Sequence, residues 1–394
     1  MTSDSRSQPT HDCEDTMPDI IGVIGGGQLA RMMIPPAVAL GLDLQVLAET
    51  DESSARLAAV RVGDYRDADT VSSFADTVDV VTFDHEHVPQ PILRNLMARG
   101  VAVHPHPEAL LYAQDKILMR QKLSKLGLPV PEWARVSSPE QLADFLSAHG
   151  GRGVLKTARG GYDGKGVRMV TDAAEASDWF AALAEDGNGG ELLVEERVDF
   201  RRELAQLIAR RPSGESATWA VVETVQKNGV CAEVLAPAPG SEGRLAETAA
   251  EIATRVADGL GVTGVLAVEM FETTDERILI NELAMRPHNS GHWTIEGSVT
   301  SQFEQHLRAV SDLPLGATDL RSPYTVMINV LGGPSAGTME DLYPEVLGQY
   351  PSAKVHSYGK QPRPGRKVGH VTVTGDTLDE TAYLARAAAS LFDR

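Results

Sequence analysis

Two glutamates in the central part of the chain are spaced so that they could share a divalent cation. Glu269 and Glu282 lie in two apolar runs, predicted to be strands, on either side of a polar turn. If that turn is centred between Asp275 and Glu276, the carboxylates face each other across a hairpin, where two like charges are destabilising. A magnesium ion would remove this repulsion, and the amide oxygen of Asn281 is a further hard ligand. The alternative is an exposed hairpin with unpaired acids.

A glycine-rich loop, residues 156–166, follows a short apolar run that ends at Lys156. Its four glycines allow positive φ angles and a close backbone approach, so that successive N–H groups can donate to phosphate oxygens. Lys156 and Lys165 add positive charge. These features predict a loop that covers phosphate, and the alternative is a solvated glycine-rich turn.

The segment after the second predicted strand, residues 284–294, is dense in hydrogen-bond donors. It contains Arg286, Asn289, Ser290 and His292. Because it comes directly after the predicted metal hairpin, we expect these side chains to face the same cleft and to hold an anion or orient a substrate. In the helix that follows, His306 is expected to be a satisfied surface or boundary histidine and not a ligand.

A basic segment, residues 360–370, lies near the C-terminus. It carries Lys360, Arg366 and Lys367 in a chain whose formal net charge is −19. Prolines stiffen the segment, and its cations could clamp a phosphate, bidentately in the case of Arg366. A solvated basic turn is the alternative interpretation.

The N-terminal part begins with an apolar run, residues 20–24, followed by a glycine turn and a helix start at 25–30. The turn fits the spacing G-x-G-x-x-A, and Glu49 ends the next predicted strand, as in dinucleotide-binding folds. NAD binding is therefore one interpretation, although a strand-to-helix turn needs glycine for its geometry alone. A later strand delivers Glu86, in a loop of two acids and two histidines, to the sheet edge where ligands bind. We expect Glu86 to contact a polar substrate, and we do not expect this loop to bind a metal.

Composition limits the classes of protein to which the chain can belong. At 394 residues, 42% of them hydrophobic, it is long enough for two or three domains. The net charge argues against a general binder of nucleic acid or anionic membranes. Cys13 and Cys231 are far apart, so we expect neither a disulfide framework nor a thiolate cluster, which fits a reducing compartment. Residues 1–18 lack the apolar core of a signal peptide, and no apolar run reaches membrane-spanning length.

The order of the predicted elements indicates a mixed α/β and α+β protein with three domains. We expect a disordered tail at 1–18, a Rossmann-like domain at 19–113, a central domain at 114–318 with a glycine-loop lid at about 152–224, and a small β-rich C-terminal domain at 319–394.

These motifs occur in the order found in ATP-grasp ligases, and the chain resembles that superfamily. Within it, the closest likeness is to the 5-(carboxyamino)imidazole ribonucleotide synthetases of purine biosynthesis. The resemblance is carried by residues 25–32, 160–166, 281–294 and 363–370, of which the last two segments are the most specific. It spans the chain from about residue 20 to the C-terminus. It implies an ATP-grasp fold with a Rossmann-like N-terminal domain and a small β-rich C-terminal domain.

The resemblance also implies a reaction. ATP, bicarbonate and 5-aminoimidazole ribonucleotide would give the N-carboxylated ribonucleotide, ADP and phosphate, through carboxyphosphate. The cofactors would be ATP and Mg²⁺, with two metal ions possible. The protein would be a cytoplasmic homodimer that binds neither nucleic acid nor a membrane.

The residues and the resemblance together assign four roles. Glu269 and Glu282 would bind magnesium. Asp163, a candidate proton acceptor, would take part in catalysis with Tyr162, Arg286 and Lys360. The nucleotide would contact Lys116, Lys156, Gly161, Tyr162, Asp163, Gly164, Lys165, Gly166, Glu195, Glu196, Arg197, Val198, Glu203, Asn281 and Glu282. The ribonucleotide substrate would contact Gln28, Leu29, Glu86, Asn289, Ser290, His292, Lys360, Arg366 and Lys367.

Two departures from the family pattern leave roles open. Gln226 stands where relatives often carry histidine, and the loop at 84–87 differs from a more acidic and aromatic version. Another ATP-grasp ligase that uses formate or bicarbonate on a different amine is the near alternative. An NAD-dependent dehydrogenase would leave the glutamate pair and the Lys156 loop unexplained. The intact metal-binding acids argue against a third alternative, a catalytically silent nucleotide-binding regulator.

Overall fold

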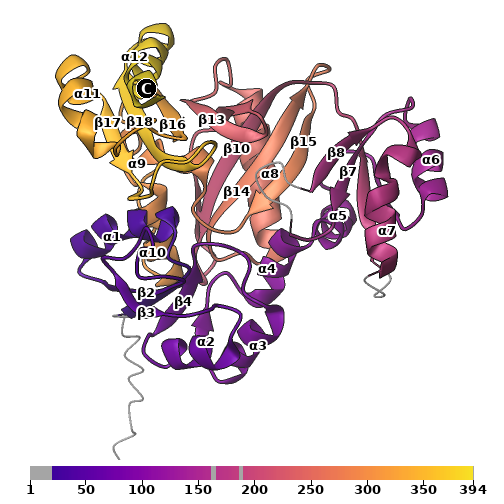
Figure 1. Cartoon of the computed structure of the whole chain (residues 1–394), viewed down its shortest axis with the longest axis horizontal. Helices are drawn as coiled ribbons and strands as arrows, with labels where there is room; N and C mark the ends of the chain where they lie inside the picture. The colour runs from indigo at the N-terminus through magenta and orange to yellow at the C-terminus, as the bar shows by residue number, and fades with distance from the viewer. Residues whose placement is uncertain (1–19, 161–165, 186–189, 394) are drawn as a thin grey trace, which may run out of the picture.

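The computed structural model describes residues 20–160, 166–185 and 190–393 (Figure 1). Its N-terminal part is a five-stranded parallel sheet in the order β3-β2-β1-β4-β5. Helices α2 and α3 pack on one face, and α1 packs on the other. The elements are β1 Ile20–Ile24, α1 Gln28–Leu40, β2 Asp43–Ala48, β3 Ala59–Val62, α2 Ala68–Ala75, β4 Val80–Phe83, α3 Gln90–Ala98 and β5 Ala102–Val103.

A four-stranded antiparallel sheet, here called the lid sheet, has the order β6-β9-β7-β8 and lies apart from the N-terminal sheet in Figure 1. Helices α6 and α7 cover it through an apolar core of their own. Helices α4 and α5 connect the two sheets along the chain. The bounds are α4 Pro107–Gln114, α5 Lys116–Lys125, β6 Trp133–Val136, α6 Pro139–Ala148, β7 Gly153–Thr157, β8 Val167–Val170, a 3₁₀ turn Ala173–Ala176, α7 Ser177–Glu185 and β9 Leu192–Glu196.

The lid sheet takes its strands from residues 133–196. The segment expected to form a lid from the sequence, 152–224, starts later. It also includes residues 200–210, 216–218 and 222–224, which form two strands and the first half of a third strand in another sheet. The expected domain limits remain predictions. A lid that moves as one sheet would end with β9, because strands hydrogen-bonded into another sheet cannot move with it.

The third sheet, here called the large sheet, has nine strands in the order β15-β14-β10-β12-β13-β16-β18-β17, with β11 beside β10. Strand β13 pairs with β16, so the C-terminal strands continue the central sheet without a break. Its strands are β10 Phe200–Arg210, β11 Ser216–Thr218, β12 Val222–Lys227, β13 Val230–Ala236, β14 Gly264–Thr273, β15 Ile278–Ala284, β16 Tyr324–Leu331, β17 Lys354–Ser357 and β18 Lys367–Gly375.

The remaining helices pack around the large sheet. They are α8 Arg244–Leu260, α9 Thr294–Gly297, α10 Gln302–Val310, α11 Tyr343–Gln349 and α12 Leu378–Ser390, with 3₁₀ turns at Asn289–Gly291, Glu340–Leu342 and Leu391–Asp393. Helix α10 also packs against α1, on the second face of the N-terminal sheet. Among the described residues, no helix combines the length and the apolar character needed to cross a membrane.

His306 of α10 lies at this junction and is fully buried. Its Nε2 lies 2.8 Å from Thr82 Oγ1 of β4, and its Nδ1 accepts a hydrogen bond from the Val265 N–H at 3.1 Å. Burial lowers the pKa of His306 to about 3, so the imidazole is neutral. The expectation of a surface or boundary histidine was therefore wrong about its location, although both ring nitrogens have partners.

The glycine turn before α1 is closed by two carboxylates of the N-terminal part. The Gly26 N–H donates to Glu49 Oε2 at 3.1 Å, and the Gly27 N–H donates to Asp84 Oδ2 at 3.1 Å. Asp84 Oδ1 also accepts from the Ala30 N–H at 2.8 Å, so this side chain caps the first turn of α1. A dinucleotide pyrophosphate would need these amides. In this fold, carboxylates already satisfy them.

We predict that Gly27→Ala destabilises the protein by about 1–3 kcal/mol, because a Cβ there would overlap the carboxylate of Asp84. Chemical denaturation measures the change. Gly348→Ala, in α11 with open space around its Cβ, is the control and should be neutral or stabilising. Equal stability of the two variants would contradict the capping role of Asp84.

Candidate active site

A cavity of about 1740 Å³ lies where the lid sheet, the large sheet and the N-terminal part meet. Most of the site residues expected from the sequence line it. These are Gln28, Leu29, Glu86, Lys116, Lys156, Glu195, Glu196, Arg197, Val198, Glu203, Glu269, Asn281, Glu282, Arg286, Asn289, His292 and Lys367. The fold therefore brings together side chains that are separated by more than 300 positions in the chain.

Four described residues expected at the site lie outside the cavity lining: Gly166, Ser290, Lys360 and Arg366. Ser290 is buried, with its Oγ 2.9 Å from His288 Nδ1. Lys360 Nζ donates to Gln28 Oε1 at 2.5 Å, so it lies beside a lining residue. Arg366 donates to the Gln361 carbonyl oxygen at 3.3 Å. Gly161, Tyr162, Asp163, Gly164 and Lys165 fall outside the described residues.

The predicted pairing of Glu269 with Glu282 is confirmed, but for a different reason from the one expected. Pairs near the turn, such as Phe271 with Leu279, are centred on Asp275, and a β-bulge at Asn281 then shifts the register by one residue. Consecutive side chains in a regular strand point to opposite faces. The bulge changes this, so Asn281 and Glu282 both reach the cavity.

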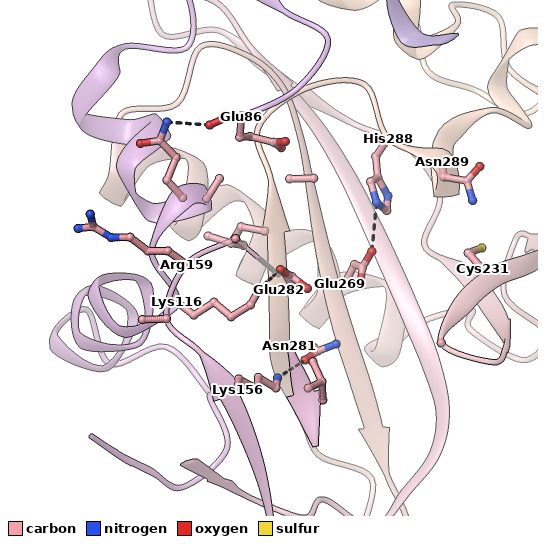
Figure 2. A pocket seen from close by; sticks show the side chains of 18 of the residues that line it. Glu86, Lys116, Lys156, Arg159, Cys231, Glu269, Asn281, Glu282, His288 and Asn289 are labelled. Atoms are coloured by element: carbon pink, nitrogen blue, oxygen red, sulfur yellow. Dashed lines mark hydrogen bonds and ion pairs between the residues drawn. The ribbon is translucent and has the colours of Figure 1, made fainter. Parts of the chain in front are cut away.

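The carboxylates of this hairpin are in electrostatic conflict. Burial, followed by the charges of Glu282 and Glu203, raises the pKa of Glu269 to about 8. Glu269 Oε1 lies 3.1 Å from His288 Nε2, and Lys116 forms an ion pair with Glu282 (Figure 2). Oxygen donors placed in this way fit a divalent cation that also takes ligands from phosphate. Among the residues that the structure describes, no three His, Cys, Asp or Glu side chains form a metal-binding group, so such a cation would need further ligands.

The side chain of Glu195, which was expected to contact the nucleotide, already has two cationic partners in the protein. Its carboxylate is buried, with Oε2 2.7 Å from Lys156 Nζ and Oε1 2.5 Å from Arg120 Nε. Burial raises the pKa of Glu195, but the attraction of Arg120 and Lys156 outweighs burial and lowers it to about 2. The side chain of Glu195 therefore orients two cations, one of which lines the cavity.

Glu203 and Gln226 lie on neighbouring strands of the cavity wall. Burial raises the pKa of Glu203, and a hydrogen bond from Gln226 partly counters that effect. The glutamine that departs from the family pattern therefore contacts the acid that was expected to bind ribose. This contact gives Gln226 a structural role in the wall whether or not it also contacts a ligand.

A second ion pair joins the N-terminal part to the segment after β15. Arg286 Nε donates to Glu86 Oε2 at 2.7 Å, although the two residues are 200 positions apart. Gln114 Nε2 donates to the backbone oxygens of Glu86 at 2.7 Å and Val88 at 2.9 Å. Both side chains of the ion pair line the cavity, so the pair fixes one wall of the site.

Sequence reasoning missed four residues that support the site: Asp84, Gln114, Arg120 and His288. Arg120 lies four positions after Lys116 in α5, which places the two cations on one face of the helix. That spacing was a usable signal. No local pattern indicated Asp84 as the cap of α1 or Gln114 as the anchor of the Glu86 loop, because their partners come from other elements.

Family models match three consecutive parts of the chain. Residues 18–114 match the ribonucleotide synthetase preATP-grasp domain, 121–303 the ATP-grasp domain, and 325–383 the phosphoribosylaminoimidazole carboxylase C-terminal domain. The N5-carboxyaminoimidazole ribonucleotide synthase of Mycobacterium tuberculosis is 50% identical over 374 residues, which cover 94% of this chain and 87% of that protein. The enzyme of the same name from Corynebacterium ammoniagenes is 48% identical, over 94% of this chain and 91% of its own.

The chain belongs to the N5-carboxyaminoimidazole ribonucleotide synthase family. Solved structures agree. The enzyme from Aspergillus clavatus in complex with ADP and 5-aminoimidazole ribonucleotide superposes with a TM-score of 0.85 at 32% identity, covering 95% of this chain and 98% of that one. The synthetase from Thermus thermophilus gives a TM-score of 0.83 at 37% identity, over 95% and 98% of the two chains.

This membership confirms the expected fold class, an ATP-grasp fold between an N-terminal preATP-grasp domain and a C-terminal domain. It also confirms the expected function and enzyme class, since the chain is an ATP-grasp ligase of this family. The dehydrogenase interpretation is wrong, in agreement with the occupied amides of the glycine turn.

We predict that Glu86→Ala lowers the free energy of unfolding by about 2–4 kcal/mol, because it leaves the Arg286 guanidinium without its carboxylate. The double variant Glu86→Ala/Arg286→Met should lose less than the sum of the single changes. Urea unfolding of all three variants measures the coupling. Glu251→Ala, at an exposed position of α8, is the control. Additive losses would show that the pair does not hold the two parts together.

Proposed function

We propose that the chain carboxylates 5-aminoimidazole ribonucleotide with ATP and bicarbonate, giving N5-carboxyaminoimidazole ribonucleotide, ADP and phosphate. The observation that carries this proposal is the cavity itself, which is lined by two lysines, by the paired carboxylates of the hairpin and by the start of α1. The complex of the Aspergillus relative with ADP and the ribonucleotide supports the same two ligands here.

We assign the nucleotide to the part of the cavity between the lid sheet and the large sheet. Lys116 and Lys156 line it from α5 and β7. Lys116 donates to the Glu282 carboxylate and Lys156 to the Asn281 amide oxygen, so both ammonium groups already bind oxygen atoms there and would face the phosphates. Residues 195–198 lie where β9 leaves the lid sheet and would frame the adenine. Glu203 would accept from the ribose hydroxyls, and the glycine loop, partly outside the described residues, would cover the phosphates.

Glu269 and Glu282 would hold Mg²⁺, with Asn281 as an additional oxygen ligand. A bound Mg²⁺ supplies positive charge that screens the phosphate oxygens and the two carboxylates at once. In the chain itself, Lys116 and Lys156 stabilise negative charge that develops during phosphoryl transfer. Two metal ions are compatible with this arrangement of acids.

We assign the ribonucleotide to the other end of the cavity. Gln28 and Leu29 line it from the start of α1, and Glu86, Asn289, His292 and Lys367 line it from three other segments. Arg286 would orient the anionic carboxyl donor while it keeps its ion pair with Glu86. Lys360 would act through Gln28, and Arg366 and Ser290 would support this end of the cavity from outside its lining.

The proposed chemistry has two steps. A bicarbonate oxygen attacks the γ-phosphorus of ATP, the bond to the β-phosphate oxygen breaks, and ADP leaves with carboxyphosphate formed. The exocyclic amine then attacks the carboxyl carbon, phosphate leaves, and the amine loses one proton. Asp163, with Tyr162 beside it in the glycine loop, is the proposed proton acceptor. A closed cavity limits the loss of carboxyphosphate to water.

We predict that ADP release requires the ribonucleotide and bicarbonate, and that Glu282→Gln lowers kcat by about 100-fold or more, because one carboxylate no longer offsets the metal charge. A coupled assay with magnesium and ATP measures the rate. The control is Glu251→Gln on the exposed face of α8, which should retain full activity. ADP release that ignores the ribonucleotide would overturn the assigned substrate, and an unchanged rate in Glu282→Gln would overturn the metal site.

We also propose a cytoplasmic homodimer. The support is the likeness to the family, together with the acidic, cysteine-poor composition that fits a reducing compartment. Sedimentation equilibrium should give twice the chain mass of 42.3 kDa at micromolar concentration. A mass of one chain under these conditions would refute the dimer.

A further inference from the structure

Arg120 of α5 is fully buried and does not line the cavity. Its Nε donates to Glu195 Oε1 of β9 at 2.5 Å, and its Nη2 donates to the carbonyl oxygen of Asn281 in β15 at 2.6 Å. One guanidinium thus joins a helix, the lid sheet and the large sheet. Because Arg120 is buried outside the cavity lining, any effect that it has on the site must pass through the residues that it contacts.

The first neighbour is the carboxylate that also holds Lys156. Glu195 Oε2 lies 2.7 Å from Lys156 Nζ, and the same ammonium donates to Asn281 Oδ1 at 3.2 Å (Figure 2). Because its pKa is lowered to about 2, Glu195 is ionised at neutral pH. Lys156 therefore lies permanently beside a full negative charge.

The charge balance of this group depends on Arg120. Two cations and one anion carry a formal charge of +1, and of the two cations Lys156 is the one that lines the cavity. Without Arg120 the sum is zero (1 − 1), and both oxygens of Glu195 would compete with a phosphate for the ammonium of Lys156. Such competition is strong in a buried site, because water screens it little.

The second neighbour is the bulge in β15. A bulge leaves a residue unpaired in the ladder, so its backbone groups need other partners. The guanidinium provides one for the carbonyl oxygen of Asn281, the residue inserted by the bulge. The bulge in turn directs Asn281 and Glu282 to the same cavity.

We propose that Arg120 is a positioning residue for the nucleotide. It neutralises Glu195 so that Lys156 keeps its charge for a nucleotide phosphate, and it holds the backbone that presents Asn281 and Glu282. This inference rests on the proposed function, in which Lys156 binds a phosphate.

The test removes the guanidinium with Arg120→Met and measures binding by isothermal titration. The dissociation constants of ATP and ADP should rise about tenfold or more, as is common when a supporting partner of a charged site is lost. The dissociation constant of adenosine, which carries no phosphate, should change less than about twofold. Adding Glu195→Gln removes the competing carboxylate, so the double variant should bind ATP more tightly than Arg120→Met alone.

Arg210 of β10 provides a matched control. Its Nε donates to Asp258 at 2.9 Å and its Nη1 donates to the Val262 carbonyl oxygen at 3.4 Å, the same two kinds of acceptor, and it lies outside the cavity lining. Arg210→Met should retain ATP affinity. If Arg120→Met does not fold, Arg120→Gln replaces it, because glutamine removes the charge but keeps an N–H donor for the buried acceptors.

Three results would overturn the proposal: ATP affinity that is unchanged in the folded Arg120 variant, an equal loss for adenosine and ATP, or a double variant that binds ATP no better than the single one. Lys156→Met separates this proposal from the proposed function. Unchanged ATP binding in Lys156→Met would mean that the nucleotide site itself is misassigned. Weakened binding in Lys156→Met with normal binding in Arg120→Met would refute only the role of Arg120.

Discussion

The site is organised around carboxylates that lie closer together than their charges favour. Glu269 and Glu282 oppose each other across a hairpin, and Glu195 is buried nearby on the lid sheet. Each has a positive or neutral hydrogen-bonding partner: His288, Lys116, and the pair of Arg120 and Lys156. Because buried like charges are costly unless they are compensated, these partners are a condition for the cavity to exist. The same arrangement fits a nucleotide with its divalent cation.

The backbone contributes as much to the site as the side chains do. A strand normally alternates its side chains, so a neighbouring amide and carboxylate would be separated by the sheet. The bulge in β15 removes this restriction at Asn281 and Glu282. One local irregularity thus turns a structural hairpin into a wall with two oxygen donors on one side.

The three parts of the chain are tied together at the cavity by polar contacts. Arg286 reaches Glu86, and Lys360 reaches Gln28. Arg31 of α1 donates to the carbonyl oxygen of Ser357, the last residue of β17, at 3.1 Å. Since the large sheet runs unbroken from β15 to β17, these contacts hold the N-terminal part against one continuous surface. The lid sheet is a separate ladder and is not part of this continuous surface.

The sequence by itself determined the order of the elements, the identity of the hairpin acids and many of the charged residues that line the cavity. It could do so because apolar periodicity, glycine turns and acid spacing are local patterns, and because the family signatures are short segments. Tertiary structure alone decided that Arg120 meets Glu195 and Asn281, which lie 75 and 161 positions away, and that Lys360 and Arg366 stand outside the lining. It also decided that His306 is buried and that a bulge aligns the glutamates. Such contacts depend on which surfaces of distant elements pack together, and no local pattern encodes that choice.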